Sequence, residues 1–256
     1  MKIELLSCST LIILVLSLLT GSPVVADVFS NRGNNNIQIN SNSSVTIING
    51  RVLNDEQSNC IKGDGVSLSK KRPITSSLSK LRVKGNIDVH VKHGKRGMLK
   101  IKTDSNLVDY IALSEKAGVL ELNIRGCIST TLPIKVSIVL PRLTFFESRG
   151  SGDSSINGIN ETRFKLRTRG SGDISLSGVV VNLDANARGS GDISMTSLFV
   201  TKANIFMRGS GDIHAFVKGD LAARLFGSGD LYLSGKPNSV NKKFKGSGRI
   251  IGDDRI

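Results

Sequence analysis

The sequence predicts an all-β protein, a right-handed β-solenoid preceded by a β-rich N-terminal lobe. The first observation behind this is a repeated RGSGD phrase or close variant, which begins at Arg149, Arg169, Arg188, Arg208, Phe226 and Lys245. The second is its period, because successive copies are separated by 20, 19, 20, 18 and 19 residues. The third is that apolar residues recur two apart on both sides of each GSG, which is the periodicity of a β-strand.

The first 26 residues are predicted to be a secretory signal peptide. A basic start at Met1-Lys2 precedes an apolar stretch over 11–19, and Val24-Val25-Ala26 forms a small-residue cleavage signal before Asp27. The apolar stretch is about half of the ~20 residues that a membrane-spanning helix needs. We therefore expect an exported chain without a transmembrane segment after signal removal, in the periplasm or on the surface of a bacterium.

Residues 27–142 are expected to form two further parts. The range 27–72 is Asn- and Ser-rich and predicts a flexible polar leader, with a hairpin candidate over 45–53 around the turn Asn49-Gly50 and a polar connector over 62–73. The range 73–142 predicts a β lobe, since alternating apolar residues recur over 81–91, 97–103, 118–125 and 132–143. The segment 106–115 fits a short helix or a strand equally well.

From residue 143 to 252, each unit of about 19 residues reads as a strand, a Gly-Ser-Gly corner, a second strand and a return. One unit cannot bury its apolar stripe alone, whereas stacked units can. Glycine suits a tight corner because it adopts positive φ without penalty. An antiparallel meander with similar turns is the alternative, and the fixed register favours the solenoid. The predicted corner residues are Gly150, Gly152, Asp153, Gly170, Gly172, Asp173, Gly189, Gly191, Asp192, Gly209, Gly211, Asp212, Gly227, Gly229, Asp230, Gly246 and Gly248.

In a solenoid, equivalent residues stack about 4.8 Å apart. The repeated arginines would then form one ladder and the repeated aspartates another, and like charges at that spacing repel by roughly 1 kcal/mol in water. One interpretation is structural: the carboxylates accept backbone N–H bonds at the corner and interleave with the arginines. The other is functional: either the arginine ladder, or the aspartate ladder with Ca²⁺, is a ligand surface.

The charge balance points to a class of partner. The formal net charge is +14 and the pI is near 10, which favours polyanions such as acidic glycans or other components of the cell envelope. The alternative is that the positive charge only keeps a β-rich protein soluble and protects its edges. Export argues against nucleic acid as the physiological target. The candidate ligand residues are Arg149, Arg169, Arg188 and Arg208, aided by Lys165, Arg167, Lys243 and Lys245.

Signals of catalysis or of a cofactor are weak. The aspartates recur in every unit, whereas a catalytic site is expected to break a repeat once. His90 and His93 are three apart in a predicted strand and so face opposite sides, and His214 stands alone. We expect neither an enzyme nor a bound metal or cofactor, although a polysaccharide-cleaving β-helix is an alternative. Cys60 and Cys127 remain after signal removal, and in an oxidising compartment they are candidates for a disulfide.

Several segments, in a fixed order, carry a family resemblance over about 74–250. They are KGNIDVHVKHG (84–94), VLELNIR (119–125), LPIKVSIVLPRLTFFESRGSGD (132–153), the GSGD units and GKPNSVNKKFKGSGRI (235–250). With these segments, the chain resembles the putative auto-transporter adhesin family with the head GIN domain. The resemblance implies a β-rich, solenoid-like fold on the bacterial envelope or surface, and it implies no catalytic residue.

We therefore expect a non-catalytic, exported, adhesin-like binding module that presents a basic solenoid face to acidic glycans or other polyanions. A structural envelope scaffold without a specific ligand, which contacts itself or neighbouring proteins, is the main alternative. The sequence is compatible with a monomer and with an oligomer.

Overall fold

The computed structural model describes residues 60–252 and, before them, the backbone of six short strands. The chain divides into two units, residues 1–60 and 61–256. The strands of the first unit are β1 (Leu5–Cys8), β2 (Leu11–Leu14), β3 (Val28–Ser30), β4 (Asn36–Ile39), β5 (Val45–Ile48) and β6 (Arg51–Asn54). β5 and β6 pair antiparallel, as a hairpin over 45–53 requires. Apart from these strands, the predicted signal peptide and the leader up to residue 59 lie outside the described residues.

The second unit begins with a lobe of short strands. Its elements are β7 (Ile61–Lys62), β8 (Ser67–Pro73), β9 (Lys80–Lys84), β10 (Asp88–His93), β11 (Met98–Asp104), the 3-10 turn η1 (Val108–Tyr110), β12 (Ile111–Lys116), β13 (Val119–Ile124), β14 (Ile128–Ser129) and β15 (Lys135–Leu140). The segment that fitted a helix or a strand is divided between η1 and β12. In residues 60–252, no helix is long and apolar enough to cross a membrane.

The polar connector expected over 62–73 is instead largely the strand β8. It pairs antiparallel with β11 along its whole length, from Met98–Pro73 to Asp104–Ser67. Every residue of β8 is exposed, so the strand has no alternation of buried and exposed side chains that its sequence could have displayed. Lysines on an exposed edge strand also discourage pairing with other chains.

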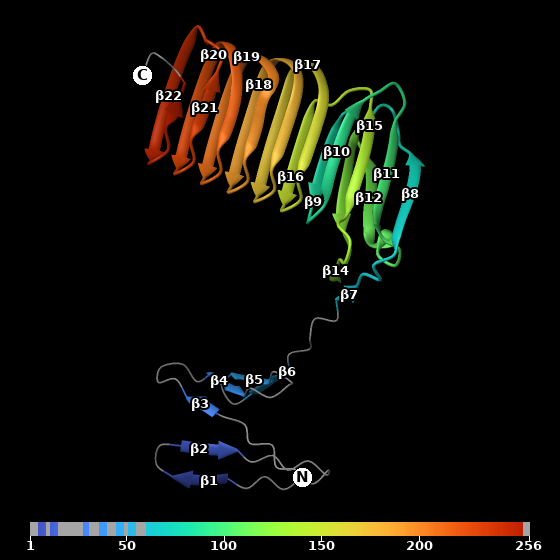
Figure 1. The fold of residues 1–256 in the computed structure, drawn as a ribbon, viewed down its shortest axis with the longest axis vertical. Coiled ribbons are helices and arrows are strands. Elements are labelled where there is room, and N and C mark those ends of the chain that lie inside the picture. Colours follow the sequence, from blue (N-terminus) through green and yellow to red (C-terminus); the bar gives the residue numbers. More distant parts are fainter. Residues whose placement is uncertain are drawn as a thin grey trace. The chain divides into compact units, whose positions relative to one another are not determined.

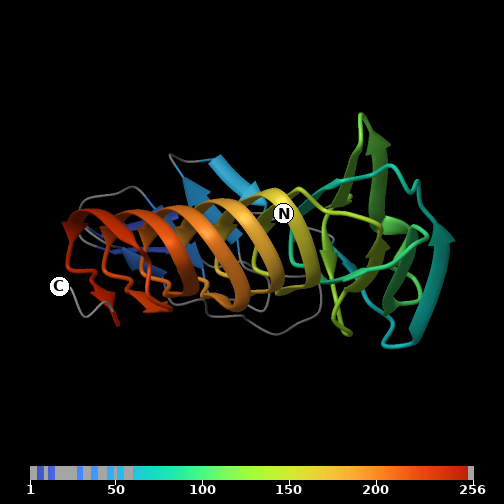
Figure 2. The same cartoon turned by 90° about the horizontal axis from the view of Figure 1, so that it is seen from above.

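The repeat region is a β-solenoid of parallel coils, as predicted (Figure 1). Its strands are β16 (Phe145–Gly150), β17 (Ser154–Gly170), β18 (Ile174–Gly189), β19 (Ile193–Gly209), β20 (Ile213–Gly227), β21 (Leu231–Ser234), β22 (Ser239–Gly246) and β23 (Ile250–Ile251). The long strands β17 to β20 follow one another along the stack, each bent around the coil (Figure 2). Each pairs in parallel with the next, which excludes the antiparallel meander.

The stack begins earlier than residue 143. β9 pairs in parallel with β16, and β10 with β17, so these two strands of the range 73–142 form the first level of the solenoid. Their connection, Gly85 to Asp88, lies where the later coils have GSGD. The lobe and the solenoid therefore share one continuous sheet.

The core consists of inward-facing apolar residues that stack from coil to coil. One inward-facing position is occupied, from coil to coil, by Leu81, Phe146, Leu166, Ala185, Ile205 and Ala223, each at most 1% exposed. The side chains between them along each strand face outward. Because the apolar column is continuous, each coil buries the stripe of its neighbour, and the outward faces are left for polar residues.

Candidate functional site

At the six GSG corners, the backbones of successive coils pack so closely that only glycine fits. The first glycine of each has φ between +132° and +155°. A Cβ atom on Gly189 would lie 1.9 Å from the carbonyl oxygen of Gly170 in the preceding coil, and the other corners are equally close. Real Cβ atoms are never found at such a distance, so the repeated glycines are explained by the stacking of backbone on backbone.

The aspartates of the corners form a ladder of hydrogen bonds. The backbone N–H of each one donates to Oδ1 of the preceding one, at 2.8–3.1 Å. The ladder runs through Asp88, Asp153, Asp173, Asp192, Asp212 and Asp230, and ends where the N–H of Arg249 donates to Asp230. A carboxylate that accepts a backbone N–H forms a charge-assisted bond, which offsets the repulsion along the ladder.

The arginines do not interleave with this ladder. The only ion pair to one of its carboxylates in the described range is that of Arg249 with Asp230, at 3.6 Å. The repeated arginines instead point outward from the strand that precedes each corner. They stack in register in what we call the arginine column, which contains Lys84, Arg149, Arg169, Arg188, Arg208, Phe226 and Lys245.

A second outward column lies two residues before the arginine column. It contains Arg82, Glu147, Arg167, Asn186, Phe206, Arg224 and Lys243. We call the two columns together the basic face. Glu147 is its only acid, with 8% of its side chain exposed, and it binds Arg82 at 3.1 Å and Arg149 at 2.7 Å. One buried carboxylate thus holds two guanidinium groups at the start of the face.

Aromatic rings contact two of the other arginines. The guanidinium of Arg188 lies 5.7 Å from the ring centre of Phe206 and also donates to Asn186. Arg167 lies 5.9 Å from the ring centre of Phe145. Cation–π contacts of this kind restrict a guanidinium without neutralising its charge.

A groove opens where these arginines meet. Arg149, Arg167, Arg169 and Arg188, from three successive coils, line it together with Glu147 and Asn186. Within residues 60–252, three of these arginines, Arg167, Arg169 and Arg188, have no ion pair, and Arg149 is paired with Glu147. The groove therefore concentrates positive charge on side chains that are exposed and only partly compensated, which is an arrangement suited to an anion.

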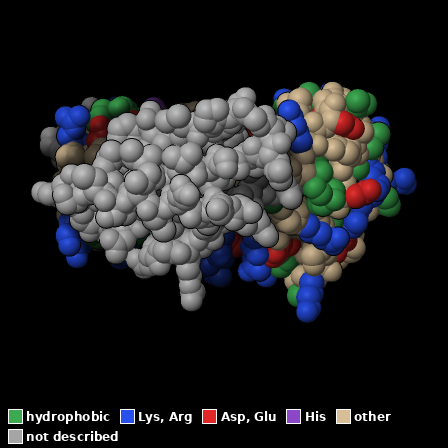
Figure 3. Space-filling model, turned by 90° about the horizontal axis from the view of Figure 1, so that it is seen from below, with side chains coloured by type: hydrophobic (Ala, Val, Ile, Leu, Met, Phe, Trp, Pro, Cys, Tyr) green, Lys and Arg blue, Asp and Glu red, His purple; other side chains and the backbone are tan. Residues whose placement is uncertain are grey.

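The basic residues of the lobe are arranged differently. In the space-filling view, Lys and Arg side chains on the visible part of the lobe are mixed with Asp and Glu (Figure 3). Two ion pairs lie within the lobe, Lys70–Asp109 and Arg72–Glu115, and Lys84 of the arginine column is paired with Glu121 of the lobe. Charge on the lobe is thus partly balanced locally, whereas four of the six cations of the arginine column have no ion pair within residues 60–252.

The remaining candidates from the sequence are placed elsewhere. Cys60 and Cys127 are disulfide-bonded in the structure. His214 stacks on Tyr232, with ring centres 4.5 Å apart, and belongs to the other face of the coils. No group of three or more acidic, histidine or cysteine side chains in the described part of the chain is arranged to hold a metal ion.

Sequence reasoning missed the first level of the ladder. Lys84, Gly85 and Asp88 occupy the places of Arg, Gly and Asp in the later RGSGD phrases, although Asn86 and Ile87 replace the Ser-Gly between them. The spacing from glycine to aspartate is the signal that could have identified this corner. Phe145 and Phe206, which support the arginines, also went unnoticed, since the strand period alone does not show which residues are neighbours across coils.

A match to a family model shows which protein family this chain belongs to. The family model described as putative auto-transporter adhesin, head GIN domain, matches residues 77–237, more than half of the chain. The chain belongs to this family. Membership of an adhesin family favours a binding role and an exported bacterial protein. None of the curated proteins compared with the chain matches it.

Solved structures share the fold of this head GIN family member. A putative adhesin from Bacteroides fragilis NCTC 9343 has 20% identity and a TM-score of 0.62, covering 74% of this chain and 98% of its own. A putative lipid binding protein from Parabacteroides distasonis ATCC 8503 has 20% identity and a TM-score of 0.53, covering 76% and 100%. At this level of identity the likeness establishes the fold alone.

Proposed function

We propose that the protein is a non-catalytic, adhesin-like binding module whose basic face binds acidic glycans or other polyanions of the bacterial cell envelope. The observation that carries the proposal is the arginine column. Six of its seven members are cationic, they stack in register on adjacent coils, and three of its four arginines, Arg169, Arg188 and Arg208, have no ion pair within residues 60–252.

Such a column is costly unless something binds it. Each pair of neighbouring cations at about 4.8 Å repels by roughly 1 kcal/mol in water, and by more where the medium is less polar. The ladder of aspartates relieves none of this cost through ion pairs to Arg149, Arg169, Arg188 or Arg208. A polyanion lying along the column would remove the repulsion and add attraction, so binding and electrostatic relief would coincide.

The scaffold also lowers the entropy cost of binding. The column is carried by strands whose corners are fixed by glycine stacking and by the aspartate ladder, so little backbone has to be ordered when a ligand arrives. Glu147, Phe145 and Phe206 restrict several of the guanidinium groups in advance. Guanidinium groups bind carboxylate, sulfate and phosphate through paired hydrogen bonds, which supports an acidic polymer as the ligand class.

The proposal is tested by binding the purified protein to uronic-acid, sulfated and phosphate-bearing glycans, to neutral glycans, to lipopolysaccharide and to DNA. We expect saturable binding to one acidic class that persists at physiological salt, where charges are screened beyond about 8 Å. Equal binding to every polyanion that disappears with salt, or no binding at all, would contradict the proposal. That outcome would favour a structural scaffold of the envelope.

A further inference from the structure

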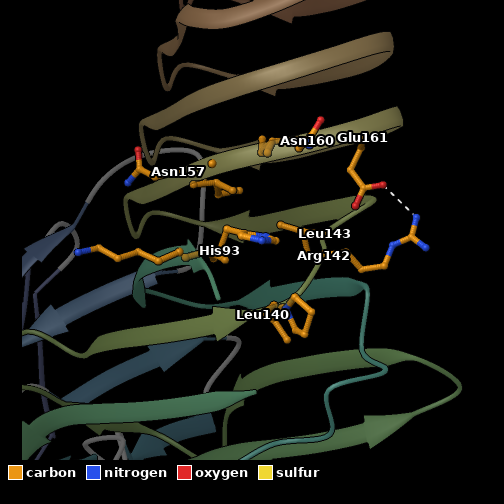
Figure 4. Close-up of a pocket in the computed structure, with 13 residues that line it drawn as sticks. His93, Leu140, Arg142, Leu143, Asn157, Asn160 and Glu161 are labelled. Carbon is orange, nitrogen blue, oxygen red and sulfur yellow. Dashed lines mark hydrogen bonds and ion pairs between the residues drawn. The ribbon is translucent and has the colours of Figure 1, made fainter. Parts of the chain in front are cut away.

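A second pocket lies at the bend of the first coils, on residues that the basic face does not use. It has a volume of about 240 Å³ and is formed by the end of β10, the residues after β15 and the bend of β17. The close-up shows His93 and Leu143 near its centre, Glu161 and Arg142 together at one end, and Asn157 at the other (Figure 4). Val91, Leu140, Ile156 and Ile159 contribute apolar, buried lining.

Glu161 breaks the repeat at this place. In the next three coils its position is taken by Val180, Val200 and Val217, which are at most 2% exposed. A carboxylate therefore begins a column that is otherwise buried valine. Only 9% of its side chain is exposed, so the charge is largely removed from water, and this costs stability unless partners compensate.

The compensation for Glu161 is partial. Its Oε2 accepts from Arg142 at 2.9 Å, and Arg142 is 60% exposed. Its Oε1 has no hydrogen-bond partner among the described side chains and backbone. A carboxylate oxygen is an acceptor only, while the guanidinium beside it has further N–H groups and is a donor only. The Oε1 acceptor of Glu161 and the remaining N–H donors of Arg142 thus lie next to each other at the edge of the apolar pocket.

A hydroxyl group satisfies both partners, because it donates to a carboxylate and accepts from a guanidinium. An anionic ligand would face Glu161, and a cation would compete with Arg142, so an uncharged ligand suits the compensated pair best. The apolar lining fits the C–H face of a small ring, and pockets of this kind combine such a lining with a few fixed polar groups.

We propose that this pocket binds one neutral sugar residue, through hydrogen bonds of its hydroxyl groups to Glu161, Arg142 and His93. The site is independent of the basic face, which takes the anionic ligand. Together they would let the chain contact a neutral sugar residue and an acidic polymer at different places on the same coils.

The test is a titration of the ¹⁵N-labelled protein with neutral methyl glycosides and with glucuronate, followed through backbone amide shifts. We expect saturable shifts confined to His93, Asn160, Glu161 and their neighbours with at least one neutral glycoside, at millimolar concentrations as befits a ligand of this size. Glucuronate is expected to shift these amides at least 10-fold more weakly.

Two variants separate binding from structure. Glu161→Val restores the residue of the valine column, and we expect it to remove the glycoside shifts while the melting temperature stays the same or rises. Asp184→Val removes the acid of an exposed ion pair with Lys165 and is expected to leave the shifts unchanged. The proposal fails if no neutral glycoside shifts the pocket amides up to its solubility limit. It also fails if Glu161→Val retains the shifts. If the wild type binds no glycoside and Glu161→Val has a lower melting temperature than the wild type, Glu161 has a structural role instead.

Discussion

The backbone N–H of Asp173 donates a hydrogen bond of 2.9 Å to the Oδ1 atom of Asp153, one coil earlier. The same bond joins each later pair of corners up to Arg249. Each aspartate is therefore both the donor to the coil before it and the acceptor from the coil after it. The last corner carries Arg249 in place of aspartate, so this corner has no carboxylate that could accept an N–H from a further coil.

The ladder should contribute measurably to stability. Replacing Asp192 by alanine removes the acceptor of the Asp212 N–H, and we expect a loss of about 1 kcal/mol in the free energy of unfolding, measured by urea denaturation. Asp192→Asn keeps an acceptor and should lose less. Asp184→Ala is the matched control, since the contacts of that aspartate are exposed, an ion pair with Lys165 and a hydrogen bond of 3.4 Å from Asn204. Equal losses in Asp192→Ala and Asp184→Ala would show that the ladder is not stabilising.

The corner glycines should tolerate no side chain. In Gly189→Ala the new Cβ would meet the backbone oxygen of Gly170 at 1.9 Å, so we expect a loss of about 4 kcal/mol or more, or failure to fold. Gly118→Ala provides the comparison: its φ is also positive, +74°, but nothing lies within 4 Å of the added atom. That variant should lose only about 1–2 kcal/mol from the left-handed backbone. Similar melting temperatures for the two variants would contradict the backbone-stacking explanation.

Stability should fall in acid partly through Asp104. Burial raises the pKa of its carboxyl, but N–H donors from Leu132, Gly65 and Thr131 outweigh this and hold the pKa below its ordinary value. The unfolded chain takes up this proton near pH 3.9. The contribution of Asp104 is therefore complete above that pH and is lost as the pH falls through the lower folded value.

The pH dependence can be measured by urea denaturation between neutral and acid pH. Asp104→Asn should be less stable than the wild type at neutral pH, and the difference should shrink as the pH falls below the unfolded pKa. Asp109→Asn, at an exposed position paired with Lys70, is the control and should leave the slope unchanged. A constant difference between Asp104→Asn and the wild type at every pH would argue against the ionised carboxylate as the cause.

The repeat made much of the solenoid predictable. Because the GSGD spacing fixes both a corner and the register of the strands around it, the inward columns and the arginine column follow from the sequence alone. The corner at 85–88 was missed because only its glycine and aspartate match the later phrases. β8 was missed because every residue of this edge strand is exposed, so its sequence has no apolar alternation.

The candidate sites were predictable to different degrees. Arg149, Arg169, Arg188 and Arg208 share one position in the repeat, so their stacking could be anticipated. The failure of the arginines to interleave with the aspartates could not, because it depends on which way each side chain leaves the corner. Glu161 could have been noticed by aligning it with Val180 and Val200, but the irregular register between Ile156 and Ile159 obscures that alignment.

The central claim is that the arginine column is a binding surface and not a structural part of the corner. The most direct test measures the affinity for the best-bound acidic polymer, against NaCl concentration, in two charge-matched variants. One replaces Arg149, Arg169, Arg188 and Arg208 by serine. The other replaces Lys71, Lys95, Lys102 and Lys116 of the lobe by serine.

The arginine variant should remain folded, lose about 10- to 100-fold in affinity, or roughly 0.3–0.7 kcal/mol per arginine, and respond less to salt. The lysine variant should bind nearly as the wild type does. Equal losses in both variants would mean that only net charge matters and that the column is not a recognition surface.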